Sequence, residues 1–294
     1  MRTPNEINAL IRLLDDPDED IYGHIKNELK SFEGDLIPKL ESHWEKNRHG
    51  HLFQSRIENL IHEIQYGDLE QILSDWWQED KPDLLKGATL ISNYKYPTLS
   101  YEELNSQVSK YTREIWLELN DHLTALEKIK IINHFIFDVH GFSGNTAGFH
   151  NHQNSVLKDV LETRKGNPLS LSILYILIAQ KLDLPIYGVN LPRHFVVAYL
   201  DPYQLTTPIE DSPVLFYINP FSKGEVFGPE ELTEFLTKVG VKESEKHFKP
   251  CDTKSILKRM LNNLIHSYSK SGELQKASEV TKLYNTLIIP HKKD

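Results

Sequence analysis

The chain has little cysteine: Cys251 is the single cysteine among 294 residues. One cysteine cannot form a disulfide within the chain, which excludes a disulfide-stapled secreted scaffold. The sequence also lacks the run of about 20 apolar residues that a membrane-spanning helix requires. It has no excess of positive charge, because its formal net charge is −9. We therefore expect no membrane partner and no nucleic-acid partner.

The N-terminal sequence lacks the apolar core of a signal peptide. The opening, MRTPNEINALIRLLDDPDED, becomes acidic before such a core could form. We therefore expect a cytoplasmic protein. Hydrophobic residues make up 39% of the chain, which is enough for one large or two ordinary cores.

The most informative segment is 163–200. Asn167 is a favourable N-cap residue, and Pro168 suits the first turn of a helix, where its missing N–H costs nothing. Every residue from 173 to 179 is apolar, so this helix has no solvent face and belongs inside a domain. Pro185 follows the helix and indicates its end.

Three β-rich runs follow that helix. They span residues 186–189, 195–200 and 214–219, and the turn at 190–193 separates the first two. His194 lies at the start of the second run. A buried helix followed by a small antiparallel sheet predicts an α+β fold.

Helical periodicity dominates the rest of the chain. Apolar residues recur at helix spacing over 7–14, and an Asp-Asp-Pro sequence at 15–17 then breaks the pattern. Two longer helices are expected at about 101–119 and 123–139, packed around the central helix. Another apolar stripe covers 256–264, in a final helical hairpin that must dock on the core, because a single repeat unit cannot stand alone.

The segment NSVLKDVLETRKGNPLSLSILYILIAQKLDLPIYGVNLPRHFVVAY (154–199) resembles the SirB regulator family of transglutaminase-like proteins. The later INPFSKGEVFG (218–228) is similar to the family's next segment. Residues 9–45 resemble a HEAT-type helix pair, and residues 256–290 resemble a tetratricopeptide-like hairpin.

The resemblance implies an α+β protein with a papain/transglutaminase-like core, flanked by α-helical repeat-like segments. It implies three regions: a HEAT-like region at 1–95, the transglutaminase-like core at 96–245, and a tetratricopeptide-like hairpin at 246–294.

The same resemblance implies positions for a catalytic triad. Transglutaminase-like enzymes use Cys at the start of the central helix, His on the next strand and Asp on the strand after it. These positions fall near Ser170, at His194 and at Asn219, and either Pro168 or Ser172 is an alternative for the first. Only the histidine is unchanged. Asparagine can still orient a histidine ring, as in Cys-His-Asn proteases.

The missing thiol weakens the catalytic interpretation most. A cysteine at a helix N-terminus has a lowered pKa and forms a thiolate, whereas a serine hydroxyl needs a base within hydrogen-bond reach. Ser170 and Ser172 are expected to bond to nearby backbone, as serine usually does at a helix start. Asn167 and Arg193 are candidates for binding in the cleft. Arg193 either holds an anionic group or is a solvated turn residue.

A second group of histidines, His140, His150 and His152, surrounds a Gly-rich loop. Their spacing matches no recognised metal pattern, and the glycines do not form a phosphate loop. We therefore expect no metal and no cofactor.

Three functional hypotheses follow. The favoured one is a non-catalytic transglutaminase-like scaffold that binds a peptide or protein partner and has a regulatory role. The alternative is a Ser-His-Asn hydrolase or acyltransferase that acts on an amide or ester through Ser170 or Ser172, His194 and Asn219. The third is metal binding by the loop histidines.

Overall fold

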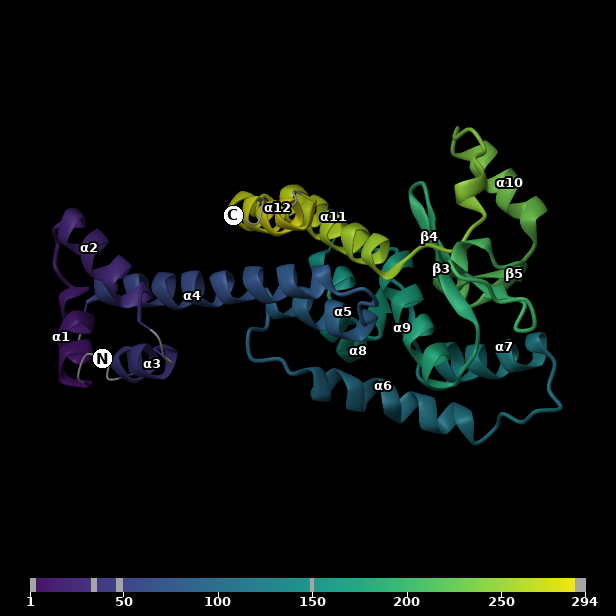
Figure 1. Ribbon diagram of the computed structural model, residues 1–294, viewed down its shortest axis with the longest axis horizontal. Coiled ribbons are helices and arrows are strands. Elements are labelled where there is room, and N and C mark those ends of the chain that lie inside the picture. The colour runs from purple at the N-terminus through teal and green to yellow at the C-terminus, as the bar shows by residue number, and fades with distance from the viewer. Residues whose placement is uncertain (1–3, 33–35, 46–49, 149–150, 289–294) are drawn as a thin grey trace. The chain divides into compact units, whose positions relative to one another are not determined.

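The computed structural model describes residues 4–32, 36–45, 50–148 and 151–288 (Figure 1). The chain forms two compact units, residues 1–71 and 72–294, and their boundary falls within one long helix, α4 (His51–Gln78). None of the helices in the described ranges is both long enough and apolar enough to cross a membrane.

The first unit is helical. It contains α1 (Pro4–Leu13), α2 (Glu19–Lys30), α3 (Ile37–Glu45) and the first part of α4. The Asp-Asp-Pro sequence separates α1 from α2, and Asp18 caps α2 by accepting hydrogen bonds from the backbone of Asp20 and Ile21. Apolar side chains from all four helices form its core, among them Ile11, Leu29, Leu40 and Ile57.

The second unit is built around α9 (Pro168–Lys181). Every residue from Pro168 to Ala179 is buried, as its apolar sequence predicts. The surrounding helices are α5 (Leu84–Asn93), α6 (Tyr101–Trp116), α7 (Ala125–Asn133) and α8 (Leu157–Thr163). Helix α9 packs against α6, α8 and the sheet (Figure 1).

A four-stranded antiparallel sheet follows α9 in the chain. Its order is β3 (Ile186–Leu191), β4 (His194–Leu200), β5 (Val214–Asn219) and β6 (Glu225–Phe227). The three strands expected from the sequence are present, and the α+β class is confirmed. Strand β6 was not predicted, because its three residues are too few to show a pattern. A two-residue parallel pair, β1 (Ser143–Gly144) with β2 (Lys165–Gly166), lies just before α9.

The last elements of the described chain are helices. Helix α10 (Pro229–Lys238) follows the sheet, and α11 (Thr253–Ser271) and α12 (Leu274–Ile288) form a hairpin. Gly272 ends α11 in the left-handed conformation, with a φ of 81°. Helix α11 packs against α5, α9 and β3, so the hairpin docks on the core as expected.

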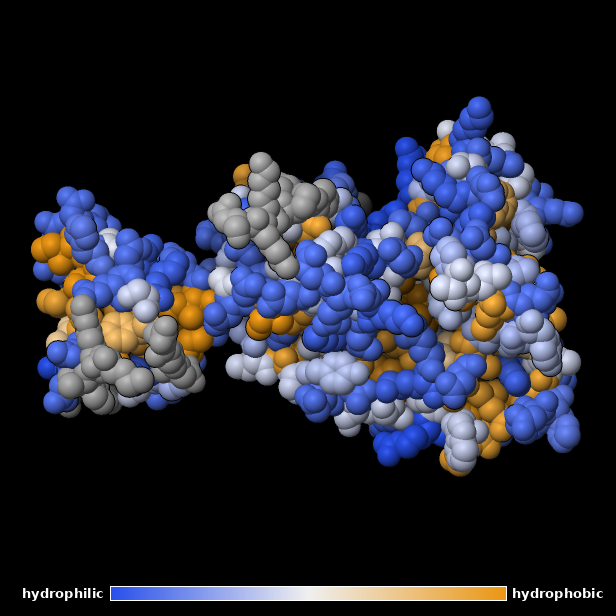
Figure 2. Space-filling model, viewed as in Figure 1, coloured by the Kyte–Doolittle hydropathy of each residue, from blue (hydrophilic) through white to orange (hydrophobic). Residues whose placement is uncertain are grey.

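Short helical turns connect several of these elements. The residues after α7 form a π-helical turn, η1 (His134–Val139). The 3₁₀ turns among the described residues are η2 (His152–Ser155), η3 (Ile209–Asp211), η4 (Pro220–Ser222) and η5 (Glu245–His247). On the face shown in Figure 2, hydrophilic side chains cover most of the second unit and apolar ones form scattered patches.

Candidate functional site

A cavity of about 230 Å³ lies at the N-terminal end of α9, within the second unit. Four segments contribute to its lining: η2, the start of α9, the β3–β4 hairpin and α11. The lining includes Asn167, Pro168, Arg193, His194, Arg259 and Asn263. We call this space the α9 cavity.

Asn167 holds the start of α9 in place. Its side-chain oxygen accepts a hydrogen bond from the backbone N–H of Ser170 (2.9 Å), and its amide nitrogen donates to Oγ of Ser155 (2.9 Å). In return, the backbone N–H of Asn167 donates to Oγ of Ser170 (3.0 Å). These bonds form a capping box, which fixes the helix start beside the cavity.

The hydroxyls of the two candidate serine nucleophiles are hydrogen-bonded to the backbone. Oγ of Ser170 donates to the carbonyl of Asn167 (3.2 Å), and Oγ of Ser172 donates to the carbonyl of Pro168 (2.8 Å). Only 1% of Ser170 and 0% of Ser172 is exposed to solvent. Among the residues that the structure describes, no hydrogen bond joins either hydroxyl to His194. Neither serine therefore has the geometry of an activated nucleophile.

The backbone before α9 leaves no room for a side chain. A Cβ atom on Gly166 would lie 2.6 Å from Oγ of Ser170 and 3.0 Å from Cγ of Leu171. The absence of a side chain at this position therefore lets the capping box close.

His194 and Asn219 are brought together by the sheet. Nε2 of His194 lies 3.3 Å from Oδ1 of Asn219, which also accepts a hydrogen bond from the backbone N–H of Phe221 (3.2 Å). An amide oxygen can only accept, so Nε2 carries the proton and Nδ1 is left as an acceptor. Burial lowers the pKa of His194. The imidazole is therefore neutral at neutral pH.

The structure thus joins two of the three predicted triad positions. The third alternative for the nucleophile, Pro168, lines the same cavity as His194. Ser170 and Ser172 are not among the residues that line it. Proline has no group that can act as a nucleophile. Arg193, the other binding candidate, is exposed in the loop that precedes His194.

The residues that α11 contributes to the cavity were missed by sequence reasoning: they are Arg259, Asn263, His266 and Ser267. Arg259 and Asn263 lie one turn apart on α11 and face the start of α9. The apolar stripe of α11 predicts that this helix packs on the core. The polar residues beside that stripe, one turn apart, indicate a polar edge of the contact, but they do not show which element packs against that edge.

Cys251 is not a substitute nucleophile. It precedes α11 and is not among the residues that line the α9 cavity. Burial raises the pKa of its thiol to about 12, and the neighbouring Asp252 acts in the same direction. The thiol therefore remains protonated at neutral pH and is a poor nucleophile.

The loop histidines do not converge. Nε2 of His140 lies 2.8 Å from a carboxylate oxygen of Glu114, while the ring of His152 stacks on Tyr268 at 5.0 Å between centroids. His150 lies outside the described residues. Within residues 4–32, 36–45, 50–148 and 151–288, no group of three His, Cys, Asp or Glu side chains is arranged to hold a metal ion.

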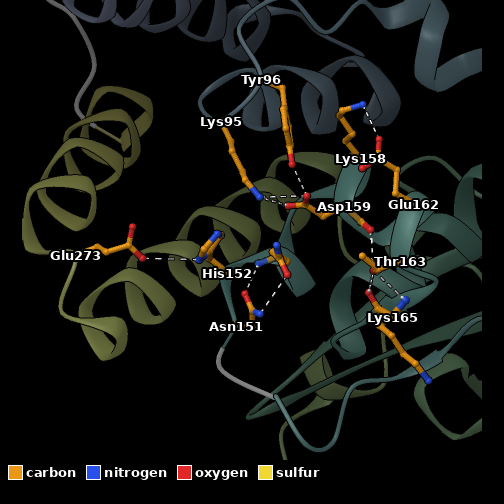
Figure 3. Close-up of polar contacts among 11 residues, drawn as sticks. Lys95, Tyr96, Asn151, His152, Lys158, Asp159, Glu162, Thr163, Lys165 and Glu273 are labelled. Carbon is orange, nitrogen blue, oxygen red and sulfur yellow. Dashed lines mark hydrogen bonds and ion pairs between the residues drawn. The ribbon is translucent and has the colours of Figure 1, made fainter. Parts of the chain in front are cut away.

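Figure 3 shows the polar contacts around His152 and the helix that follows it. The buried carboxylate of Asp159 accepts hydrogen bonds from Lys95 (2.9 Å to Nζ) and from the hydroxyl of Tyr96. Because Asp159 lies on α8 and both partners follow α5, these bonds tie the two helices together. They fix the segment that carries Ser155, the hydrogen-bond partner of Asn167.

Comparison with known proteins identifies the family. Residues 102–262 match the model of the transglutaminase-like superfamily. The chain is 27% identical to a UPF0162 protein of Xylella fastidiosa (strain 9a5c), over 71% of this chain and 75% of that protein. It is 35% identical to a UPF0162 protein of Pasteurella multocida, over 32% of this chain and 36% of the relative.

A eukaryotic protein also shows similarity. The chain is 26% identical to F-box only protein 21 of Mus musculus, over 66% of this chain but only 34% of that longer protein. No solved structure matches the chain. Because the family model covers more than half of the sequence and includes α9, the sheet and much of α11, the chain belongs to the transglutaminase-like superfamily.

Proposed function

We propose that this protein is a non-catalytic transglutaminase-like scaffold that binds a peptide or protein partner at the α9 cavity. It would then act as a cytoplasmic regulator of the SirB type. In this proposal a HEAT-like region (1–95) and a tetratricopeptide-like hairpin (246–294) flank the transglutaminase-like core (96–245).

One observation carries the proposal: the hydroxyl protons of Ser170 and Ser172 are both donated to backbone carbonyls of the same helix start. A serine nucleophile must instead give its proton to a base in the transition state, and neither hydroxyl is bonded to His194. The cavity that would bind a substrate is nevertheless present beside that histidine. A site that keeps its cleft and lacks its nucleophile favours binding over catalysis.

The alternative is a Ser-His-Asn hydrolase or acyltransferase, and the hydrogen bond between His194 and Asn219 favours it. Labelling with a serine-reactive fluorophosphonate separates the two functions. We expect no labelling of the folded wild-type protein. Labelling of Ser170 or Ser172 that disappears in His194→Ala would establish the alternative and remove the scaffold proposal.

Partner binding is tested with a variant that fills the cavity. In Asn263→Trp a large ring occupies the α9 cavity, whereas in Asn262→Trp the same ring lies on the exposed face of α11. Affinity capture from the source cells should recover the same partner with wild type and with Asn262→Trp. We expect Asn263→Trp to lose it. Equal recovery by all three proteins would contradict a role for the cavity.

A further inference from the structure

The α9 cavity contains two arginines, Arg193 and Arg259. Among the described residues that line it, there is no Asp or Glu. The chain as a whole has 42 acidic residues against 33 basic ones, so a cationic cavity is opposite in sign to the protein. Opposite local charge is the arrangement that attracts an anionic ligand.

Arg259 is half-buried, and its hydrogen-bond partners in the described part of the chain are neutral. Its Nη1 atom donates to Oδ1 of Asn190 (3.0 Å) and to the carbonyl of Leu191 (3.2 Å), which are both neutral oxygens. In the part of the chain that the structure describes, no carboxylate lies within 4.0 Å of its guanidinium. Burial lowers the pKa of this guanidinium, which reflects the cost of removing its charge from water.

Arg56 shows how a buried arginine is usually paired. Arg56, in the first unit, is only 4% exposed and pairs with a carboxylate oxygen of Glu19 at 2.7 Å. Buried charges in proteins are normally paired in this way. Arg259 retains N–H groups beyond those on Nη1, and it lines both the α9 cavity and a neighbouring pocket that contains Glu210, Glu245 and Asp252.

Arg193 occupies a backbone position that favours glycine. Leu191 pairs with His194, so Pro192 and Arg193 form the two-residue loop of the hairpin. The φ of Arg193 is 62°, in the left-handed region, which glycine adopts most readily. An arginine here places a cation at the cavity next to His194.

We propose that Arg193 and Arg259 bind a carboxylate of the partner peptide in the α9 cavity. This inference rests on the proposed binding function, because a carboxylate is the anion that an unmodified peptide carries. At about 230 Å³ the cavity is smaller than the roughly 300–1,000 Å³ of sites for drug-sized ligands, so it admits one side chain or one chain end. The positive end of the α9 dipole adds to the attraction.

The test uses small probes that differ only in charge. Acetyl-glycylglycine carries a C-terminal carboxylate, acetyl-glutamate amide carries a side-chain carboxylate, and acetyl-glycylglycinamide carries neither. Binding is followed by NMR through the signals of His194 and Asn263. We expect saturable shifts with at least one carboxylate probe and none with the amide, and the tighter probe identifies the source of the carboxylate. Equal binding of the amide would overturn the proposal, and so would binding of inorganic phosphate alone.

Arg193→Gly is the sharpest variant, because glycine suits the backbone there and folding is retained. Arg164→Gly is its matched control: Arg164 is also exposed, has a φ of 58° and lies outside the cavity. We expect carboxylate affinity to fall at least tenfold in Arg193→Gly and in Arg259→Gln, and to be unchanged in Arg164→Gly. Wild-type affinity in Arg193→Gly would contradict the assignment.

The two proposals fail in different ways. Loss of the partner in Asn263→Trp, without binding of any carboxylate probe, would leave the scaffold function standing and remove the carboxylate inference. Conversely, His194-dependent fluorophosphonate labelling would remove the non-catalytic function, while binding of a carboxylate probe would still support the anion site.

Discussion

Nε2 of His194 donates a hydrogen bond to Oδ1 of Asn219 across two neighbouring strands, β4 and β5. An amide in this position orients the ring as a carboxylate would, yet it adds no negative charge. A neighbouring carboxylate would raise the pKa of the histidine, whereas here burial lowers it. The pair therefore fixes a neutral imidazole at the edge of the cavity.

The first prediction concerns this choice of amide. In Asn219→Asp, a negative charge at the same distance should stabilise the imidazolium form and raise the pKa of His194 above its wild-type value. The histidine ring signals, followed by NMR between pH 4 and 9, measure the change. Asn262→Asp adds the same charge on the exposed face of α11 and serves as the control. An equal shift in both variants would contradict a direct effect through the Asn219 contact.

The second prediction restores a thiol to the cavity. In a Cys251→Ser background, Pro168→Cys places a cysteine at the N-terminus of α9, where the helix dipole lowers a thiol pKa. We expect iodoacetamide to alkylate this thiol at pH 7 much faster than it alkylates Cys251 in the wild type, whose pKa is about 12. Rates are measured by mass spectrometry of the intact protein. Similar rates at the two positions would show that the helix start does not activate a thiol.

The sequence specified the central helix because its signals are local. Asn167 and Pro168 define the start of α9, and an uninterrupted apolar run defines its burial, so both could be predicted without tertiary information. The helix expected at 123–139 is instead α7 followed by the π-helical turn η1. A π-helical turn changes the hydrogen bonding from i→i+4 to i→i+5, and apolar periodicity does not report that change.

Only part of the candidate site could be predicted from the sequence. His194 and Asn219 could be proposed because the family resemblance implies a histidine and its partner on consecutive strands, and the structure places them in contact. Arg259 could not be proposed, because its role depends on how α11 docks against the β3–β4 hairpin. Docking is fixed by packing between residues distant in the chain, and no local pattern of charges encodes it.

The third prediction tests the close packing before α9. In Gly166→Ala, the new methyl group would lie 2.6 Å from Oγ of Ser170, so the capping box must open or the backbone must shift. We expect a loss of about 1–3 kcal/mol in the free energy of unfolding, the usual cost of overpacking. Urea unfolding measures the loss. Gly23→Ala, in helix α2 with no atom within 4 Å of its Cβ, should be neutral or stabilising.

The fourth prediction concerns pH. Burial lowers the pKa of both His152 and His194 below the value of 6.5 that is usual for histidine. As the pH falls through about 6.5, the unfolded chain therefore takes up protons that the folded protein does not, and the free energy of unfolding decreases. This decrease in the free energy of unfolding stops once the pH is below the pKa values of the two histidines in the folded protein. The carboxylates of Glu63 and Glu273, whose pKa values are lowered from 4.5, lose their stabilising effect only in more acidic solution.

A variant at His152 isolates one of these contributions. His152→Phe keeps an aromatic ring against Tyr268 but removes the titrating group, so it should lose less stability than the wild type between pH 7.5 and pH 5.5. Urea unfolding at both pH values gives the two differences. Well above pH 7 the histidine is neutral in both states, so any difference between the proteins there does not come from its titration. If the wild type and His152→Phe lose the same stability on acidification, the burial of His152 does not make folding pH-dependent.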